Sequence, residues 1–195
     1  MNKKIKYILG FIILLLLFSK LTENISFGPL IGVVEINDVI MSSKDIIDDF
    51  DYLIKVRKVD GILLRINSPG GAVAPSQEIY QKVIRVSRDL KIPVVASMGS
   101  VAASGGYYIA LGADTIIANP GTTTGSIGVI MGYPIIEKLM SKIGVDWEVI
   151  KSGDFKDAGS FYRFSKIEEK EYFQDFVDGV HKQFVNVVAN QRNLE

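Results

Sequence analysis

The stretch Gly61-Ile-Leu-Leu-Arg-Ile66-Asn-Ser-Pro-Gly-Gly71 is the clearest structural signal in this sequence. Its first six residues are almost all apolar and predict a buried strand, and the remaining five predict a glycine-rich turn. A helix is expected over residues 75–90, and Ile92-Pro-Val-Val-Ala-Ser97 then predicts a second strand. Strand, helix and strand at this spacing predict a right-handed crossover and a parallel pair.

The same alternation extends in both directions along the chain. Before this unit, a strand is expected at 32–36 and an amphipathic helix at 44–58. After it, we expect short helices at 104–111 and 134–143, strands at 115–118 and 147–151, and a long final helix that begins with a capping box of Ser165 and Glu168. The apolar stripe predicted for that helix comprises Phe173, Phe176, Val177, Val180, Phe184 and Val188. This pattern predicts an α/β domain with a parallel sheet and crossover helices.

Composition excludes several classes of function. The 22 basic and 22 acidic side chains are mixed along the sequence, so no nucleic-acid partner is expected. The absence of cysteine rules out a thiol nucleophile and disulfides, and the single histidine, His181, rules out histidine-cluster metal sites. We therefore predict neither a metal nor a cofactor.

The first 24 residues differ from the rest of the 195-residue chain. Three lysines at positions 3, 4 and 6 precede an unbroken apolar run at 7–18. We predict a membrane anchor at 1–24, whose positive flank stays in the cytoplasm while residues 25–195 form a domain outside it. A cleaved signal peptide is the alternative, although no small-x-small cleavage pattern follows Phe18.

Glycine-rich segments follow several of the predicted strands. The segment at 67–71 offers backbone N–H groups without obstructing side chains, which suits an oxyanion donor but is equally typical of a tight turn. The segment at 121–128 lacks the lysine of a phosphate-binding loop and is interpreted as a hydroxyl-lined turn.

Ser104 lies among small residues at the predicted start of a helix, in Gly99-Ser-Val-Ala-Ala-Ser-Gly-Gly-Tyr107. A serine at this position could attack a carbonyl group, with the N–H of Gly105 close enough to receive the oxyanion. The alternative is that Ser104 only caps the helix. Ala102 stands where the first glycine of a G-x-S-x-G elbow would be, so that motif does not fit.

A serine nucleophile needs a base. His181 flanks the predicted apolar stripe of the last helix and is interpreted as a packing or interface residue. Lys156 lies in the glycine-flanked segment 152–159 after a predicted strand, and a lysine acts as a base when burial lowers its pKa. The alternative for Lys156 is a solvated loop lysine.

Five segments together resemble the half-length bacterial signal peptide peptidase A family, which is related to the Clp protease and crotonase folds. They are the segments at 65–71, 94–98, 100–108, 125–129 and 151–157. The resemblance implies that Ser104 is the nucleophile, Lys156 the general base and Gly71 an oxyanion donor. It also implies a homo-oligomeric ring in which the serine of one protomer meets the lysine of its neighbour.

The resemblance further implies a serine endopeptidase of the inner membrane that cleaves remnant signal peptides on the extracytoplasmic side. Family members continue past the long helix, whereas this chain ends at Glu195, so we expect the peptidase domain at 25–195 to be truncated. Two alternatives are an inactive assembly module of the same fold and a crotonase-like acyl-CoA enzyme. The presence of both Ser104 and Lys156 argues against the first, and the predicted anchor argues against the second.

Overall fold

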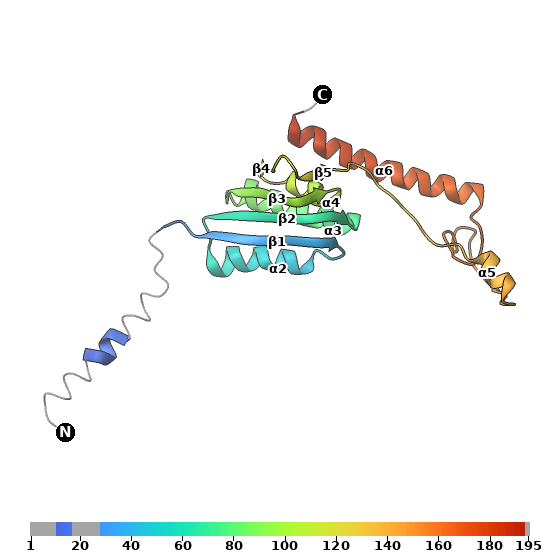
Figure 1. Ribbon diagram of the computed structural model, residues 1–195, viewed down its shortest axis with the longest axis horizontal. Helices are drawn as coiled ribbons and strands as arrows, with labels where there is room; N and C mark the ends of the chain where they lie inside the picture. Colours follow the sequence, from blue (N-terminus) through green and yellow to red (C-terminus); the bar gives the residue numbers. More distant parts are fainter. Residues whose placement is uncertain (1–10, 17–27, 194–195) are drawn as a thin grey trace, which may run out of the picture.

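The computed structural model describes residues 11–16 and 28–193 and contains a five-stranded parallel sheet (Figure 1). The pairing order is β1-β2-β3-β4, and β5 pairs with β3 beyond the end of β4. Ile62 of β2 lies opposite Val94 of β3 in a parallel register, so the predicted parallel pair is confirmed. The strands are β1 (Ile31–Ile40), β2 (Gly61–Gly71), β3 (Val94–Ala103), β4 (Thr115–Ile117) and β5 (Thr123–Gly125).

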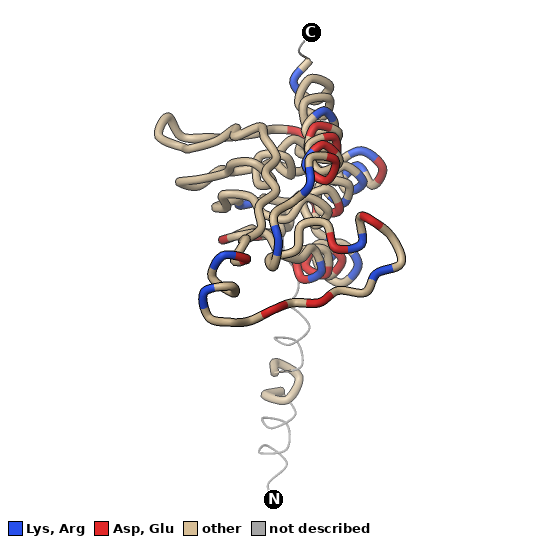
Figure 2. The backbone as a smooth tube through the Cα atoms, turned by 90° about the vertical axis from the view of Figure 1, so that its right-hand side faces the viewer, with Lys and Arg blue, Asp and Glu red and all other residues tan. Residues whose placement is uncertain are grey.

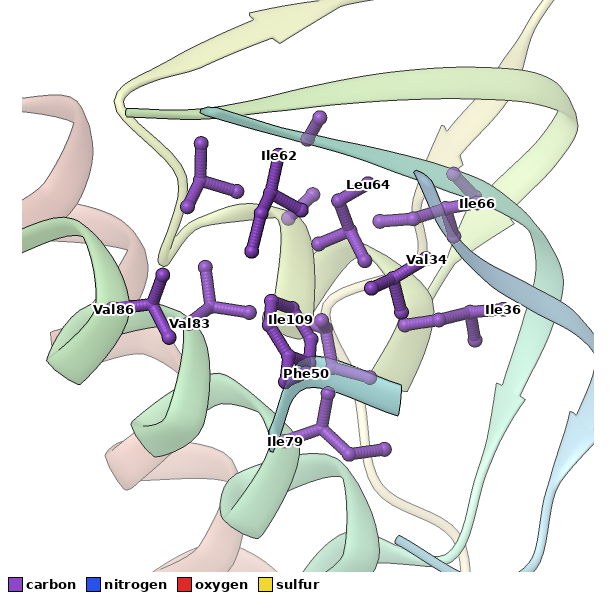
Figure 3. Close-up of a cluster of buried hydrophobic side chains, with 14 of the residues drawn as sticks. Val34, Ile36, Phe50, Ile62, Leu64, Ile66, Ile79, Val83, Val86 and Ile109 are labelled. Carbon is purple, nitrogen blue, oxygen red and sulfur yellow. The ribbon is translucent and has the colours of Figure 1, made fainter. Parts of the chain in front are cut away.

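The helices that connect these strands pack on one face of the sheet (Figure 3). The predicted helices at 44–58 and 75–90 are confirmed, the second with an earlier start, and each ends in a π-helical turn, at Leu53–Arg57 and Arg85–Asp89. The predicted short helix at 104–111 is also present. The three helices are α2 (Lys44–Tyr52), α3 (Val73–Ile84) and α4 (Gly105–Ala110).

The core forms between this helical layer and the sheet. On β2, Ile62, Leu64 and Ile66 are buried toward the helices, whereas Leu63 and Arg65 between them are only partly buried. This period of two is what a strand with one covered face requires. The fully buried partners of these β2 side chains in the core, labelled in Figure 3, come from β1 and from the helical layer. They are Val34, Ile36, Phe50, Ile79, Val83, Val86 and Ile109.

Residues 126–166, which we call the arm, leave the sheet after β5 and carry α5 (Glu137–Lys142) well away from it (Figure 1). The chain then returns along α6 (Ile167–Arg192). Of the predicted apolar stripe on this helix, only Phe184 and Val188 are buried, in a cluster with Tyr80 and Tyr108. Phe176 is 56% exposed, because the first half of α6 extends beyond the body of the domain.

Three predicted features differ in the structure. Residues 147–151 form no strand, because no described strand lies beside them to pair with, and Ile150 is 96% exposed. The predicted turn at 67–71 is instead the end of β2, paired with β1 as far as Ile40 opposite Gly71. The capping box is also displaced by one residue, since the Glu169 carboxylate accepts the N–H of Lys166 at 2.9 Å.

The predicted anchor falls mostly on residues outside the described ranges. Residues 11–16 are helical, and their side chains are exposed. Within 11–16 and 28–193, no helix combines the length and the apolar character needed to cross a membrane.

Candidate active site

Ser104 occupies a strained turn between a strand and a helix. β3 ends at Ala103, α4 begins at Gly105, and Ser104 has φ 51° and ψ −121°, outside the usual regions for an L-residue. The turn is held by the N–H of Ser104, which donates to Gly125 O at 2.8 Å, and by its carbonyl, which accepts the N–H of Tyr108 at 2.8 Å. Such a conformation costs about 1–3 kcal/mol and is typical of functional sites.

The structure does not support the alternative role of Ser104, in which its side chain caps the helix. Ser104 stands at the N-cap position, but its side chain makes no capping hydrogen bond. A capping serine also has extended backbone, and Ser104 does not. The partly buried hydroxyl therefore lies at the head of α4 without the bond that would explain a purely structural role.

The glycines at the end of β2 allow it to pass directly against Ser104. Gly70 has φ +101°, and a Cβ placed there would lie 2.6 Å from the N of Gly105 and 2.8 Å from the Cβ of Ser104. A Cβ on Gly71 would lie 2.1 Å from the carbonyl oxygen of Ile40. A side chain at either position is therefore incompatible with this packing.

The two predicted oxyanion donors meet beside the serine. A Cβ on Gly105 would lie 2.4 Å from Ser76 Oγ and 3.4 Å from the backbone N of Gly71. Both glycines line the same small cavity as Ser104, of about 30 Å³, with Tyr108 and Phe184 among its apolar walls. The backbone thus places three of the four predicted site residues together.

A wider cleft adjoins this cavity. It measures about 500 Å³ and is lined by Gly70, Ser104 and Ser126 together with Val39, Pro69, Gly71, Val73, Gly128, Val129 and Ile130. Ser126 has φ 52° and directly follows Gly125, the residue that binds the Ser104 N–H. Ser126 is not among the predicted site residues, although its place after a glycine in the 121–128 segment is a signal for it.

Lys156, the fourth predicted residue, lies elsewhere in the single chain. It is exposed in the arm, where its backbone N–H donates to Gly153 O at 3.2 Å. It also lines a separate cavity with Trp147 and Tyr162. Lys156 lines neither of the cavities that Ser104 lines, and α5 and the adjoining part of the arm lie away from α4 (Figure 1). His181 lines a third cleft, beside Val129 and Asp178, on the half-buried side of α6.

Charged groups cluster in the arm next to Lys156. Hydrogen bonds from Arg163 and then Lys151 hold the pKa of Asp157 well below its usual range. The same guanidinium lowers the pKa of Glu169 to about 2. Elsewhere acidic side chains predominate on α6, whereas basic and acidic side chains are mixed along the arm (Figure 2). Within residues 11–16 and 28–193, no His, Asp and Glu side chains are grouped to hold a metal ion.

Known proteins match both halves of the chain. The model of peptidase family S49 matches residues 87–195, and that of Clp protease matches residues 32–124. A Synechocystis protein named "Putative protease slr0021" is 50% identical over 141 residues, covering 72% of this chain and 50% of that protein. An Enterococcus faecium protein named "Putative signal peptide peptidase SppA" is 42% identical over 139 residues, covering 71% and 40%.

A solved structure confirms the fold. A ClpP1 mutant from Listeria monocytogenes has a TM-score of 0.55 at 17% identity, covering 92% of this chain and 78% of its own. The predicted α/β fold of the Clp protease type is therefore confirmed. The matched region spans about half of the curated relatives or less. Since the S49 model covers more than half of the residues, this chain belongs to peptidase family S49.

Proposed function

We propose that this chain forms the catalytic domain of a membrane-anchored serine endopeptidase with Ser104 as nucleophile and Lys156 as general base. The observation that carries the proposal is the strained backbone of Ser104, next to two glycines that line one small cavity with it. Membership of a peptidase family supports it. The cost of that strain also argues against an inactive assembly module, which would have no need of it.

The reaction follows from these groups. Ser104 Oγ attacks the carbonyl carbon of the scissile bond while Lys156 Nζ takes its proton. The resulting oxyanion accepts hydrogen bonds from the N–H groups of Gly71 and Gly105, each worth about 10²–10³ in rate. The protonated lysine then gives its proton to the leaving amine, and water hydrolyses the acyl-enzyme with the lysine again as base.

Assembly is part of this proposal, because Lys156 and Ser104 are apart in one chain. We infer a homo-oligomeric ring in which the arm of one protomer brings its Lys156 to the Ser104 of the next. The arm exposes several large apolar side chains, including Ile130 at 99% and Ile150 at 96%. Burial of these side chains against a neighbour would also remove water from the lysine, as a neutral amine base requires.

The cavity beside Ser104 supports a substrate with a small apolar side chain before the scissile bond. A volume of about 30 Å³ admits a methyl-sized group or about two waters. The adjoining cleft has apolar walls at Val39, Val129 and Ile130, which suit an extended apolar peptide. Remnant signal peptides have this character. The predicted anchor at 1–24 would hold the domain against the outer side of the inner membrane, where such peptides are left.

The test uses the full-length, assembled protein and a serine-directed acylating probe. Ser104→Ala should abolish labelling, and Lys156→Ala should slow acylation by about 10²–10⁴-fold. Lys142→Ala, in the exposed part of α5, is the matched control and should label normally. Labelling that persists in Ser104→Ala, or a normal rate in Lys156→Ala, would discard this mechanism.

The shared site has its own test. When Ser104→Ala and Lys156→Ala protomers are mixed, some interfaces combine an intact serine with an intact lysine, so part of the activity should return. Mixed rings that form but stay inactive would show that the two residues do not act across an interface.

A further inference from the structure

The chain between α5 and α6 has no helix or strand, so side chains must fix its shape. Asp157, the residue after Lys156, is the centre of that arrangement. Its Oδ1 accepts from Lys151 Nζ at 2.5 Å and from Arg163 Nη2 at 2.8 Å, and its Oδ2 accepts from Arg163 Nε at 2.9 Å and Tyr162 Oη at 3.1 Å. Four donors match the full acceptor capacity of a carboxylate, so Asp157 is held in one orientation.

Arg163 bridges two carboxylates. Besides its paired bonds to Asp157, it donates to Glu169 from Nη1 at 2.8 Å and from Nη2 at 2.5 Å. The planar guanidinium can make two such bidentate contacts, which an ammonium group cannot. We call Lys151, Asp157, Arg163 and Glu169 the Arg163 cluster. Its two cations and two anions cancel, so the cluster is charge-balanced.

The cluster is tied to the helix that packs on the catalytic body. Glu169 lies in the first turn of α6 and is 1% exposed. Further along α6, the Phe184 ring contacts that of Tyr108 edge-on, with centroids 5.0 Å apart. Tyr108 belongs to α4, the helix headed by Ser104. α6 therefore connects the Lys156 loop to the body of its own protomer.

From this arrangement we propose that Arg163 is a positioning residue for Lys156: by joining Asp157 to Glu169, it sets where the loop presents the amine. The proposal rests on the proposed function, since it presumes that Lys156 is the base. Arg163 touches no reacting group. It acts only through Asp157, the residue that directly follows Lys156 in the chain. Misplacement of a catalytic group by about 1 Å can cost about 10²-fold in rate, so a loosened loop should slow acylation strongly.

The test is Arg163→Lys in the full-length assembled protein, which keeps the charge but loses the double bridge. We expect the maximal acylation rate to fall about 10²-fold with KM unchanged. Glu169→Gln, which removes the charge but keeps an acceptor oxygen, should give the same changes to a smaller extent.

Arg88→Lys is the matched control, because Arg88 also ties α6 to the body, through Gln191, but lies far from the arm in sequence and is exposed. It should leave both the maximal rate and KM unchanged. A normal maximal rate in Arg163→Lys, or a rate that falls only in proportion to the loss of assembled rings, would overturn the proposal. If Lys156→Ala itself acylates normally, the proposed function fails instead, so the two failures are distinguishable.

Discussion

The body of the domain, residues 31–125, and the arm, residues 126–166, use apolar side chains in opposite ways. In the body, large apolar residues such as Phe50, Leu64 and Ile79 are completely buried between sheet and helices. In the arm, Ile130 and Ile150 are almost completely exposed. The body can therefore gain its stability within one chain, because burial of apolar surface is the dominant favourable contribution to folding.

The arm is held by other means. Its order comes from the Arg163 cluster and from ring contacts, such as Trp147 stacked on Tyr162 with centroids 5.6 Å apart. The proposed nucleophile therefore lies on the part whose large apolar side chains are mostly buried within one chain, and the proposed base on the part where most of them are exposed. This division is what a site completed between protomers requires.

The largest effect on stability should come from truncating one aromatic ring in the body. Phe50→Ala empties a fully buried site and should lower the free energy of unfolding by about 3–5 kcal/mol. Phe155→Ala, whose ring in the arm is 50% exposed, should cost less than about 1 kcal/mol. Denaturant unfolding of both variants measures the difference, and equal losses would contradict the division.

The next effect concerns Gly70, the glycine beside Ser104. Gly70→Ala forces a side chain onto φ +101° and against Gly105 N, so it should cost about 1–3 kcal/mol and slow acylation of Ser104 about 10²-fold. Gly179→Ala, in open space on α6, is the control and should stabilise by up to about 1 kcal/mol. Thermal unfolding and probe labelling measure both. A tolerated alanine at position 70 would mean that β2 does not need this close approach.

How much of this the sequence predicts depends on whether a signal is local. The β2–β3 unit was predictable, because residues 61–66 are almost all apolar and a glycine-rich segment and a helical pattern follow them. The strand expected at 147–151 was wrong, since strand formation depends on a partner that the residues themselves do not specify. β5 was missed because only pairing with β3 makes its three residues a strand.

The site shows the same limit. The position of Ser104 at the start of a helix was predicted from its small neighbours, but its strained backbone is set by the tertiary bond to Gly125. The proximity of Gly71 and Gly105 likewise depends on how β2 meets α4. The roles of Lys156 as base and Gly71 as donor came from family resemblance and stay predictions.

Acidification should have a smaller effect on stability, and it should loosen the arm before the body. The folded-state pKa of Glu169 is depressed from 4.5 to about 2. Its contribution to the stability of the folded arm is therefore fully present above about pH 4.5 and is lost as the pH falls toward 2. Asp157 is shifted in the same direction by Arg163 and Lys151. Trp147, the single tryptophan of the chain, lies in the arm, so its fluorescence should change while far-UV circular dichroism still reports a folded body.

The variant that checks this pH dependence is Glu169→Gln. It removes the titrating group, so the acid-induced change in Trp147 fluorescence should shrink and the emission at pH 7 should already resemble the acid form. Fluorescence and circular dichroism that change together in the parent protein would contradict an arm that loosens separately from the body.

The smallest effect on folding should come from Ile150→Ser, because a side chain that is 96% exposed loses almost no burial within its own chain. The free energy of unfolding should stay within about 0.5 kcal/mol. Assembly should nevertheless weaken, since burying an isoleucine against a neighbour is worth about 1.5–3 kcal/mol, or roughly tenfold or more in the dissociation constant. Val33→Ser, 52% exposed on the open face of β1, is the matched control and should leave assembly unchanged. Analytical ultracentrifugation of both variants decides the matter: equal association constants would mean that the arm does not use its exposed apolar surface to bind a second protomer.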